Sequence, residues 1–104
     1  MDLSQALFII KNSLKEHLFI ESRHFKDECR ERNISLEEIN KLITENEIVG
    51  IAQQDQNLYK VWFDYANNKD LIVIARVLPD QGIKLITLYP CYAERRKREN
   101  VSKS

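Results

Sequence analysis

The spacing of apolar residues along the chain changes once, near Glu47, and the two patterns predict different secondary structure. Up to about residue 18, apolar side chains return every three or four positions, which is the period of one helix face. We therefore expect an amphipathic helix from about Ser4 to His17, followed by a short extended link, Leu18 to Glu21. The apolar residues that define this face are Leu3, Leu7, Ile10, Leu14 and Leu18.

Two further helices are predicted before the pattern changes, each opened by a serine. Ser22 has the side chain of an N-cap, and the charged helix behind it offers only Phe25 and Cys29 as an apolar pair at i, i+4. Asn33 tolerates the left-handed conformation that ends a helix. The sequence SLEE, from Ser35, is a capping box that opens the third helix. The apolar residues that this helix would bury are Ile39, Leu42 and Ile43.

Beyond Glu47, four runs rich in β-branched and aromatic residues predict strands: EIVGIAQ, LYKVWFDYA, LIVIARVL and IKLITLYP. They are separated by the short polar turns QDQN, NNKD and PDQG. Because short turns join antiparallel neighbours, the predicted fold class is α+β, with three N-terminal helices followed by a four-stranded antiparallel sheet. The helices should cover one sheet face and leave the other free, in a single domain over residues 1–93 whose extra N-terminal helix is residues 1–17.

Composition sets the class of protein. A chain of 104 residues that is 43% hydrophobic and 31% charged is typical of one globular domain. No apolar run is long enough to cross a membrane, and the N-terminus lacks the layout of a signal peptide, so we expect a cytoplasmic protein without a membrane segment. Cys29 and Cys91 lie far apart without metal-type spacing, which indicates free thiols and neither a metal site nor a cofactor.

Charge is unevenly distributed although the net charge is zero. From Cys91 onward there are five basic residues and two acidic ones. We expect a basic, partly disordered C-terminal tail over residues 94–104. This tail is either a solvated end or an arm that contacts phosphates, because clustered Arg and Lys release counterions from nucleic acid. Its RNA-binding candidates are Arg95, Arg96, Lys97 and Arg98.

A histidine at the head of the second helix is followed by ER-x-I-S, by LEEINKLI, by an IV strand and finally by IKLITLYP. This order resembles a family of small prokaryotic domains in the RelE/ParE-like toxin superfamily, over roughly Ile20 to Pro90. The resemblance implies a RelE/ParE-like α+β fold with an antiparallel sheet and metal-independent cleavage of RNA on the open sheet face. It also implies RNA and a cognate antitoxin protein as partners. The residues that carry it are His24, Arg32, Ile34, Ser35 and Thr87.

The chemistry of such cleavage indicates which residues would act. His24 is the candidate acid or base, because histidine titrates near neutral pH. Arg32 returns to within roughly 80° of the direction of His24 two turns later, so it is a better phosphate clamp than Arg30. Thr87 and Tyr89 complete the predicted catalytic group, because they share a strand face that we expect to lie opposite Ile86 and Leu88. Further RNA-binding candidates are Arg30 and Arg76.

Each candidate has an alternative that is purely structural. His24 is also suited to capping or to surface hydrogen bonds, and Arg32 to pairing with Glu28 at i, i+4. Arg76 either contacts a phosphate or extends to solvent. The first helix packs on its own sheet or against a second copy, so a monomer and a homodimer are both open. The neutral charge and Glu28 favour an alternative function, a non-catalytic interaction module that binds a protein through the open sheet face.

Overall fold

The computed structural model describes residues 1–66, 68–78 and 80–92, which form three helices and five strands. The predicted tail over residues 94–104 lies outside this described part of the chain. In chain order the elements are α1 (Leu3–Lys15), β1 (Phe19–Glu21), α2 (Arg23–Glu31), α3 (Leu36–Glu45), β2 (Ile48–Asp55), β3 (Leu58–Ala66), β4 (Lys69–Leu78) and β5 (Gly82–Tyr92).

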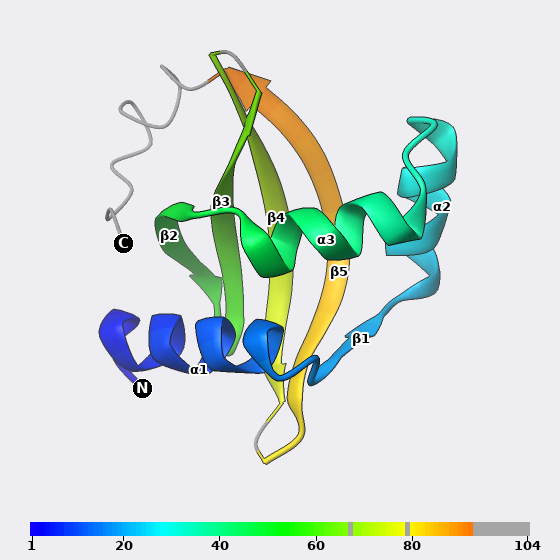
Figure 1. The fold of residues 1–104 in the computed structure, drawn as a ribbon. Coiled ribbons are helices and arrows are strands. Elements are labelled where there is room, and N and C mark those ends of the chain that lie inside the picture. The colour runs from blue at the N-terminus through cyan, green and yellow to red at the C-terminus, as the bar shows by residue number, and fades with distance from the viewer. Residues whose placement is uncertain (67, 79, 93–104) are drawn as a thin grey trace.

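The five strands form one mixed sheet in the order β1-β5-β4-β3-β2 (Figure 1). Strands β2 to β5 pair antiparallel with their neighbours in sequence, whereas β1 pairs parallel with β5. The prediction of a four-stranded antiparallel, RelE/ParE-like sheet is therefore wrong, although the fold is α+β. The segment expected to be a link is a strand, because the outer edge of β5 offers it backbone partners. Ile83 donates its N–H to the carbonyl oxygen of Leu18 at 3.0 Å, and Phe19 lies opposite Ile83.

Helix boundaries follow the predicted caps at α2 and α3. Ser22 and Ser35 are N-caps whose side chains accept from Phe25 N and Glu38 N, respectively. The first helix starts slightly earlier than predicted, because Asp2 forms a capping box with Gln5, and it ends at Lys15 rather than near His17. In a chain with only two glycines, asparagine and aspartate take the left-handed conformation at the strand turns. The residues with positive φ in those turns are Asn57, Asn68 and Asp80.

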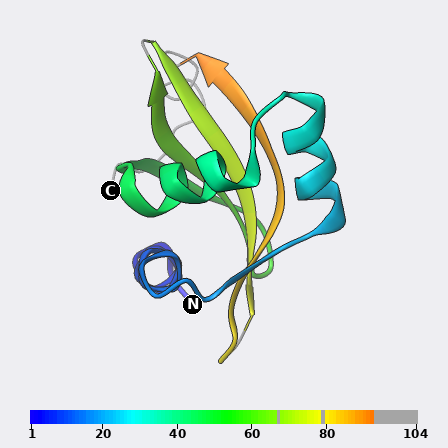
Figure 2. The same ribbon diagram turned by 45° about the vertical axis from the view of Figure 1, so that its right-hand side comes forward.

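The main hydrophobic core lies between one face of the sheet and the helices (Figure 2). In Figures 1 and 2, α1 and α3 cross this face, and α2 lies beside β5. The first helix thus packs on its own sheet, with Ala6, Ile10 and Leu14 buried in the same core as the strands. No helix in the described part of the chain is long and apolar enough to cross a membrane. The strand residues of this core include Tyr59, Val61, Phe63, Leu71, Val73, Ile83, Leu85 and Leu88.

The other face of the sheet, which we call the open face, carries a second and smaller hydrophobic cluster. Trp62, Ile72 and Ile74 are buried at its centre, and Lys60 places its ammonium 4.9 Å from the centroid of the Trp62 ring. This arrangement follows from the alternation of side chains along β3, which sends Tyr59, Val61 and Phe63 to the main core. Partly buried residues packed around the cluster are Val49, Ala52, Leu58, Ile86, Tyr89 and Cys91.

Candidate functional site

The helix α2 is held against β5 by its N-cap residue, Ser22, and by its two buried side chains. The hydroxyl of Ser22 caps the helix by accepting from Phe25 N at 3.0 Å and donates to the carbonyl oxygen of Ile86 at 2.8 Å. Phe25 and Cys29 are 0% and 1% exposed and belong to the main core. The remaining sides of α2 are charged. Because only these two side chains of the helix are buried, most of its surface lies in solvent.

Two of the predicted catalytic residues lie on one side of α2, joined by an acid. Glu28 lies between them, with Oε1 3.7 Å from His24 Nε2 and Oε2 3.4 Å from Arg32 Nε. The spacing i, i+4, i+8 produces this row, because residues four apart are neighbours on a helix surface. The side chains of His24, Glu28 and Arg32 are 64%, 21% and 37% exposed. We call these three residues the α2 row.

The contacts within the α2 row determine which atoms face solvent. Glu28 contacts Nε2 of His24, so Nδ1 is the imidazole nitrogen that no protein group of the row contacts. Arg32 meets Glu28 through Nε, which leaves its two terminal nitrogens for another anion. The α2 row therefore combines an imidazole that can accept a proton, a carboxylate that orients it, and a guanidinium whose terminal N–H groups can bind an anion.

The surroundings of α2 change the pKa of the Cys29 thiol. Burial of the thiol raises the pKa of Cys29 above its ordinary value of 9.0, and the negative charges of Glu21 and Glu28 raise it further. Cys29 is thus an inert, protonated core residue at neutral pH. Within the described residues, no group of three or more His, Cys, Asp and Glu side chains is arranged to hold a metal ion.

The other two predicted catalytic residues lie on the open face, apart from the α2 row. Thr87 and Tyr89 are half-buried and lie opposite Ile74 and Ile72 in the register of β4 and β5. Among the described residues, the ion pairs of His24 and Arg32 are to Glu28, and no hydrogen bond or ion pair joins either residue to Thr87 or Tyr89. The structure brings together the first two candidates and leaves the second two as a separate pair.

One part of the predicted face assignment in β5 is wrong. Leu88 packs in the main core as expected, but Ile86 joins the open-face cluster with Tyr89. The cause is a β-bulge: Ala75 pairs with Leu85 and Ile74 with Thr87, so Ile86 is an extra residue in β5. An extra residue shifts the alternation of side chains by one position. Sequence alternation alone gives no signal for this bulge.

The predicted RNA-binding residues lie in different environments. Arg30 forms an ion pair with Asp27 on α2, with Nη1 3.3 Å from Oδ1. Arg76 is exposed on the open face, opposite Leu58 on β3 and Lys84 on β5. The four candidates at positions 95–98 lie outside the described residues. The predicted structural alternative for Arg32, pairing with Glu28 at i, i+4, is confirmed at 3.4 Å. Sequence reasoning missed the contact of Glu28 with His24 and the position of Lys84 beside Arg76.

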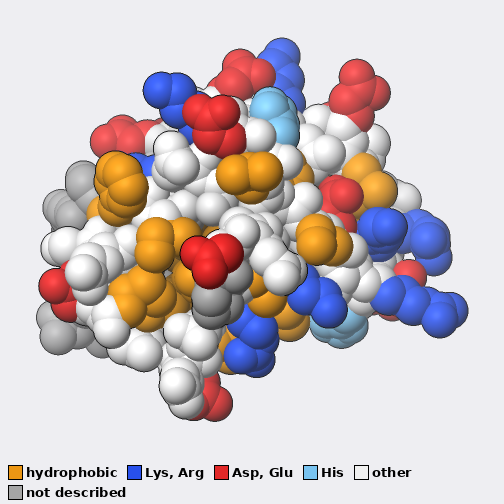
Figure 3. Space-filling model, turned by 90° about the horizontal axis from the view of Figure 1, so that it is seen from below, with side chains coloured by type: hydrophobic (Ala, Val, Ile, Leu, Met, Phe, Trp, Pro, Cys, Tyr) orange, Lys and Arg blue, Asp and Glu red, His pale blue; other side chains and the backbone are white. Residues whose placement is uncertain are grey.

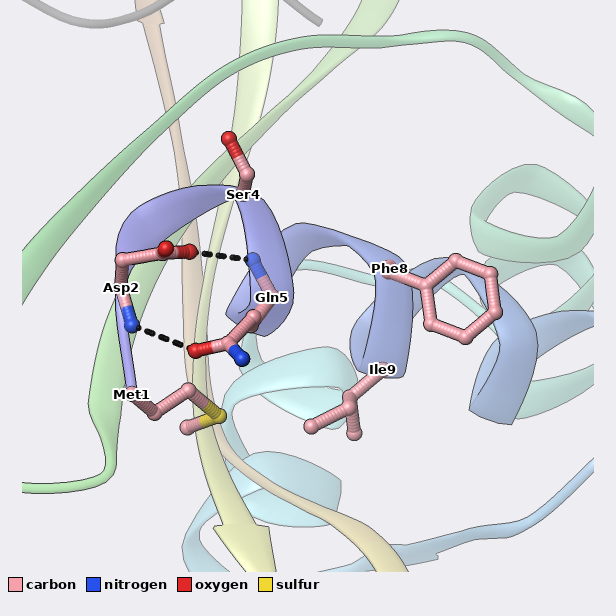
Figure 4. A pocket seen from close by; sticks show the side chains of 6 residues that line it. All are labelled: Met1, Asp2, Ser4, Gln5, Phe8 and Ile9. Atoms are coloured by element: carbon pink, nitrogen blue, oxygen red, sulfur yellow. Dashed lines mark hydrogen bonds between the residues drawn. The ribbon is translucent and has the colours of Figure 1, made fainter.

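A separate hollow lies along the outer side of α1 (Figure 4). Phe8 projects from the helix there and is 71% exposed, while Asp2 and Gln5 exchange the two hydrogen bonds of the capping box at 2.8 and 3.0 Å. Figure 3 shows hydrophobic side chains among charged ones on the end of the molecule where α1 lies. The hollow is open and largely apolar, and it contains none of the predicted catalytic residues. Its lining is Met1, Asp2, Ser4, Gln5, Phe8 and Ile9.

Comparison with known proteins identifies a family. A family model described as the MJ0788 family matches residues 4–75, which covers α1 to α3, β2, β3 and most of β4. No curated protein matches the chain. No solved structure matches it either. The description of the matching family names neither an activity nor the RelE/ParE superfamily, so the resemblance to that superfamily stays a prediction.

Proposed function

The chain belongs to the MJ0788 family, and from the geometry of α2 we propose that it is a toxin-type endoribonuclease that cleaves RNA without a metal ion. The observation that supports this proposal is the α2 row, in which one carboxylate of Glu28 lies within 3.7 Å of His24 and 3.4 Å of Arg32. In this proposal the protein acts in the cytoplasm, with RNA as substrate and a cognate antitoxin as partner.

The proposed reaction is an internal transfer of the phosphodiester. His24 takes the proton of the ribose 2′-hydroxyl at Nδ1, and the 2′-oxygen attacks the adjacent phosphorus. The bond from phosphorus to the 5′-oxygen breaks, that oxygen takes a proton from water, and the hydroxide left behind takes the proton that His24 had accepted. The products are a cyclic 2′,3′-phosphate and a 5′-hydroxyl. Glu28 stabilises the imidazolium that forms, and the terminal nitrogens of Arg32 bind the charged phosphate oxygens. Thr87 and Tyr89 hold the RNA chain in this proposal and do not transfer protons.

The test is cleavage of a labelled RNA by purified variants. His24→Ala should lower the cleavage rate by about 100- to 10,000-fold, which is the usual contribution of an acid–base group. Glu28→Gln and Arg32→Ala should each lower it as well. Lys26→Ala is the matched control, because Lys26 is an exposed cation on the same helix and lies outside the α2 row. Equal losses in Lys26→Ala and Arg32→Ala, or full activity in His24→Ala, would refute the proposal.

A second candidate function is a non-catalytic module that binds a protein through the open sheet face. The observation that favours it is Ile20, which is 55% exposed and lies opposite Lys84 on that face. Glu28 also favours it, since its carboxylate offsets the positive charge of Arg32. Titration with RNA at several salt concentrations separates the two candidates, because an RNA-binding protein shows a clear salt dependence of affinity and a protein-binding module shows none.

A further inference from the structure

One transverse row of the open face crosses all five strands near the end where β4 turns into β5. The register places Ile20 of β1 opposite Lys84 of β5, and Lys84 opposite Arg76 of β4. Arg76 in turn lies opposite Leu58 of β3, and Leu58 opposite Asp55 of β2. Side chains that are opposite each other in adjacent strands share a face. This row therefore brings two cations side by side, with an apolar residue on each flank.

The two cations at the centre of the row are adjacent without any compensating charge. Directly opposite residues have Cβ atoms about 4.5–5.5 Å apart, and like charges in such a pair are destabilising. Arg76 and Lys84 are both exposed, and neither forms an ion pair with any residue that the structure describes. The nearest acid in the row is Asp55, which is two strands from Arg76, and one of its oxygens accepts from Gln56 N at 2.7 Å.

The backbone beneath this pair is fixed, so the two cations are held in place. Val77, Ile83 and Leu85, which flank Arg76 and Lys84 in sequence, are 5%, 0% and 1% exposed in the main core. Because successive side chains of a strand point to opposite faces, Arg76 and Lys84 lie on the open face. A guanidinium and an ammonium at this separation both reach one tetrahedral anion, the first as a fork and the second as a point charge.

We infer that Arg76 and Lys84 together bind a phosphate of an RNA backbone on the open sheet face, with Ile20 and Leu58 contacting the sugars on either side. This inference rests on the proposed function for its choice of ligand, because RNA supplies a negatively charged phosphodiester beside an apolar sugar surface. It adds a binding site outside the α2 row. The site anchors the substrate and takes no part in proton transfer.

The test compares two double variants that lose the same charge. Arg76→Gln with Lys84→Gln removes the proposed site, whereas Lys11→Gln with Lys41→Gln removes two exposed lysines from the helices on the opposite side of the sheet. The probe is a single-stranded RNA oligonucleotide, and its dissociation constant is measured between 50 and 200 mM salt, a range in which phosphate contacts change affinity strongly. Thermal melting of both variants confirms folding, since all four side chains are exposed.

In the first double variant, RNA should bind more weakly, and the slope of log affinity against log salt should become shallower by about 0.7, the change expected for one lost phosphate contact to a single strand. The lysine control should keep the slope of the unmodified protein. Equal slopes in the two double variants would overturn the inference. Tight, salt-dependent binding that depends on Arg76 and Lys84, in a protein that cleaves no RNA, would uphold the inference and refute the proposed endoribonuclease.

Discussion

The hydroxyl of Ser22 links two elements, because it accepts from Phe25 N at 3.0 Å and donates to the carbonyl oxygen of Ile86 at 2.8 Å. The first contact starts α2, and the second fixes the start of the helix beside the bulge in β5. The backbone N–H of Ser22 also donates to the carbonyl oxygen of Leu85 at 2.9 Å. The position of the α2 row relative to the sheet therefore depends on one small side chain.

Replacement of Ser22 by alanine should lower the free energy of unfolding by about 2 kcal/mol, the sum of a lost N-cap and a lost hydrogen bond between elements. Ser35→Ala is the matched control, because Ser35 also caps a helix but donates only to Glu38 on the same turn. That variant should lose about 1 kcal/mol. Urea unfolding measures both values, and equal losses would show that the contact with Ile86 contributes nothing.

Gly82→Ala should be strongly destabilising, by about 3 kcal/mol or more, because two independent effects act against it. Gly82 has a φ of +88°, which residues with a Cβ rarely adopt, and an added Cβ would collide with the carbonyl oxygen of Leu18. That oxygen accepts the hydrogen bond from Ile83 that begins the pairing of β1 with β5. Asn57→Gly, at another left-handed turn position with a φ of 60°, should leave stability within about 1 kcal/mol. Thermal unfolding compares the two variants, and a mild effect of Gly82→Ala would contradict the close approach of Leu18.

Two substitutions at Trp62 should lower the free energy of unfolding by very different amounts. Trp62→Ala should lose about 3–5 kcal/mol, because the ring is 1% exposed and its removal leaves a cavity in the open-face cluster. Trp62→Phe should lose much less, since the indole Nε1 is buried without a hydrogen-bond partner and phenylalanine has no such group to desolvate. Circular dichroism during chemical unfolding measures both. A loss in Trp62→Phe as large as that in Trp62→Ala would indicate that the indole nitrogen is bonded in solution.

Stability should fall as pH rises above about 9, because the pKa of Cys29 is higher in the folded protein than in the unfolded chain. Below the unfolded value both states keep the thiol protonated and the stability is fully present. Between the two values the unfolded chain loses its proton while the folded protein keeps it, so the free energy of unfolding decreases until the folded pKa is passed. Chemical unfolding at pH 7 to 10.5 should show this slope, and Cys29→Ala should flatten it. An equal slope in Cys29→Ala would assign the effect to other groups.

The sequence predicted local structure better than it predicted pairing. The caps at Ser22 and Ser35 were predicted correctly, because each depends on residues within a few positions of one another. The strand β1 was missed, since its three residues show no period and its partner Ile83 lies far away in sequence. The bulge at Ile86 was missed because it depends on how β5 pairs with β4, which the sequence of β5 alone does not show. The helical period correctly placed His24 and Arg32 on one side of α2 and correctly paired Arg32 with Glu28, but it did not predict the contact of Glu28 with His24.

The parallel pairing of β1 with β5 sets an order for folding during synthesis. Phe19 leaves the ribosome early and has no strand to pair with until Ile83 has emerged, after α2, α3 and three further strands. Until then α2 lacks the strand on which it packs, and Phe25 and Cys29 lack most of their core partners. Contacts so distant in sequence also slow folding, because a long loop must close before they form. We expect the nascent chain to need protection from aggregation until β5 completes the sheet.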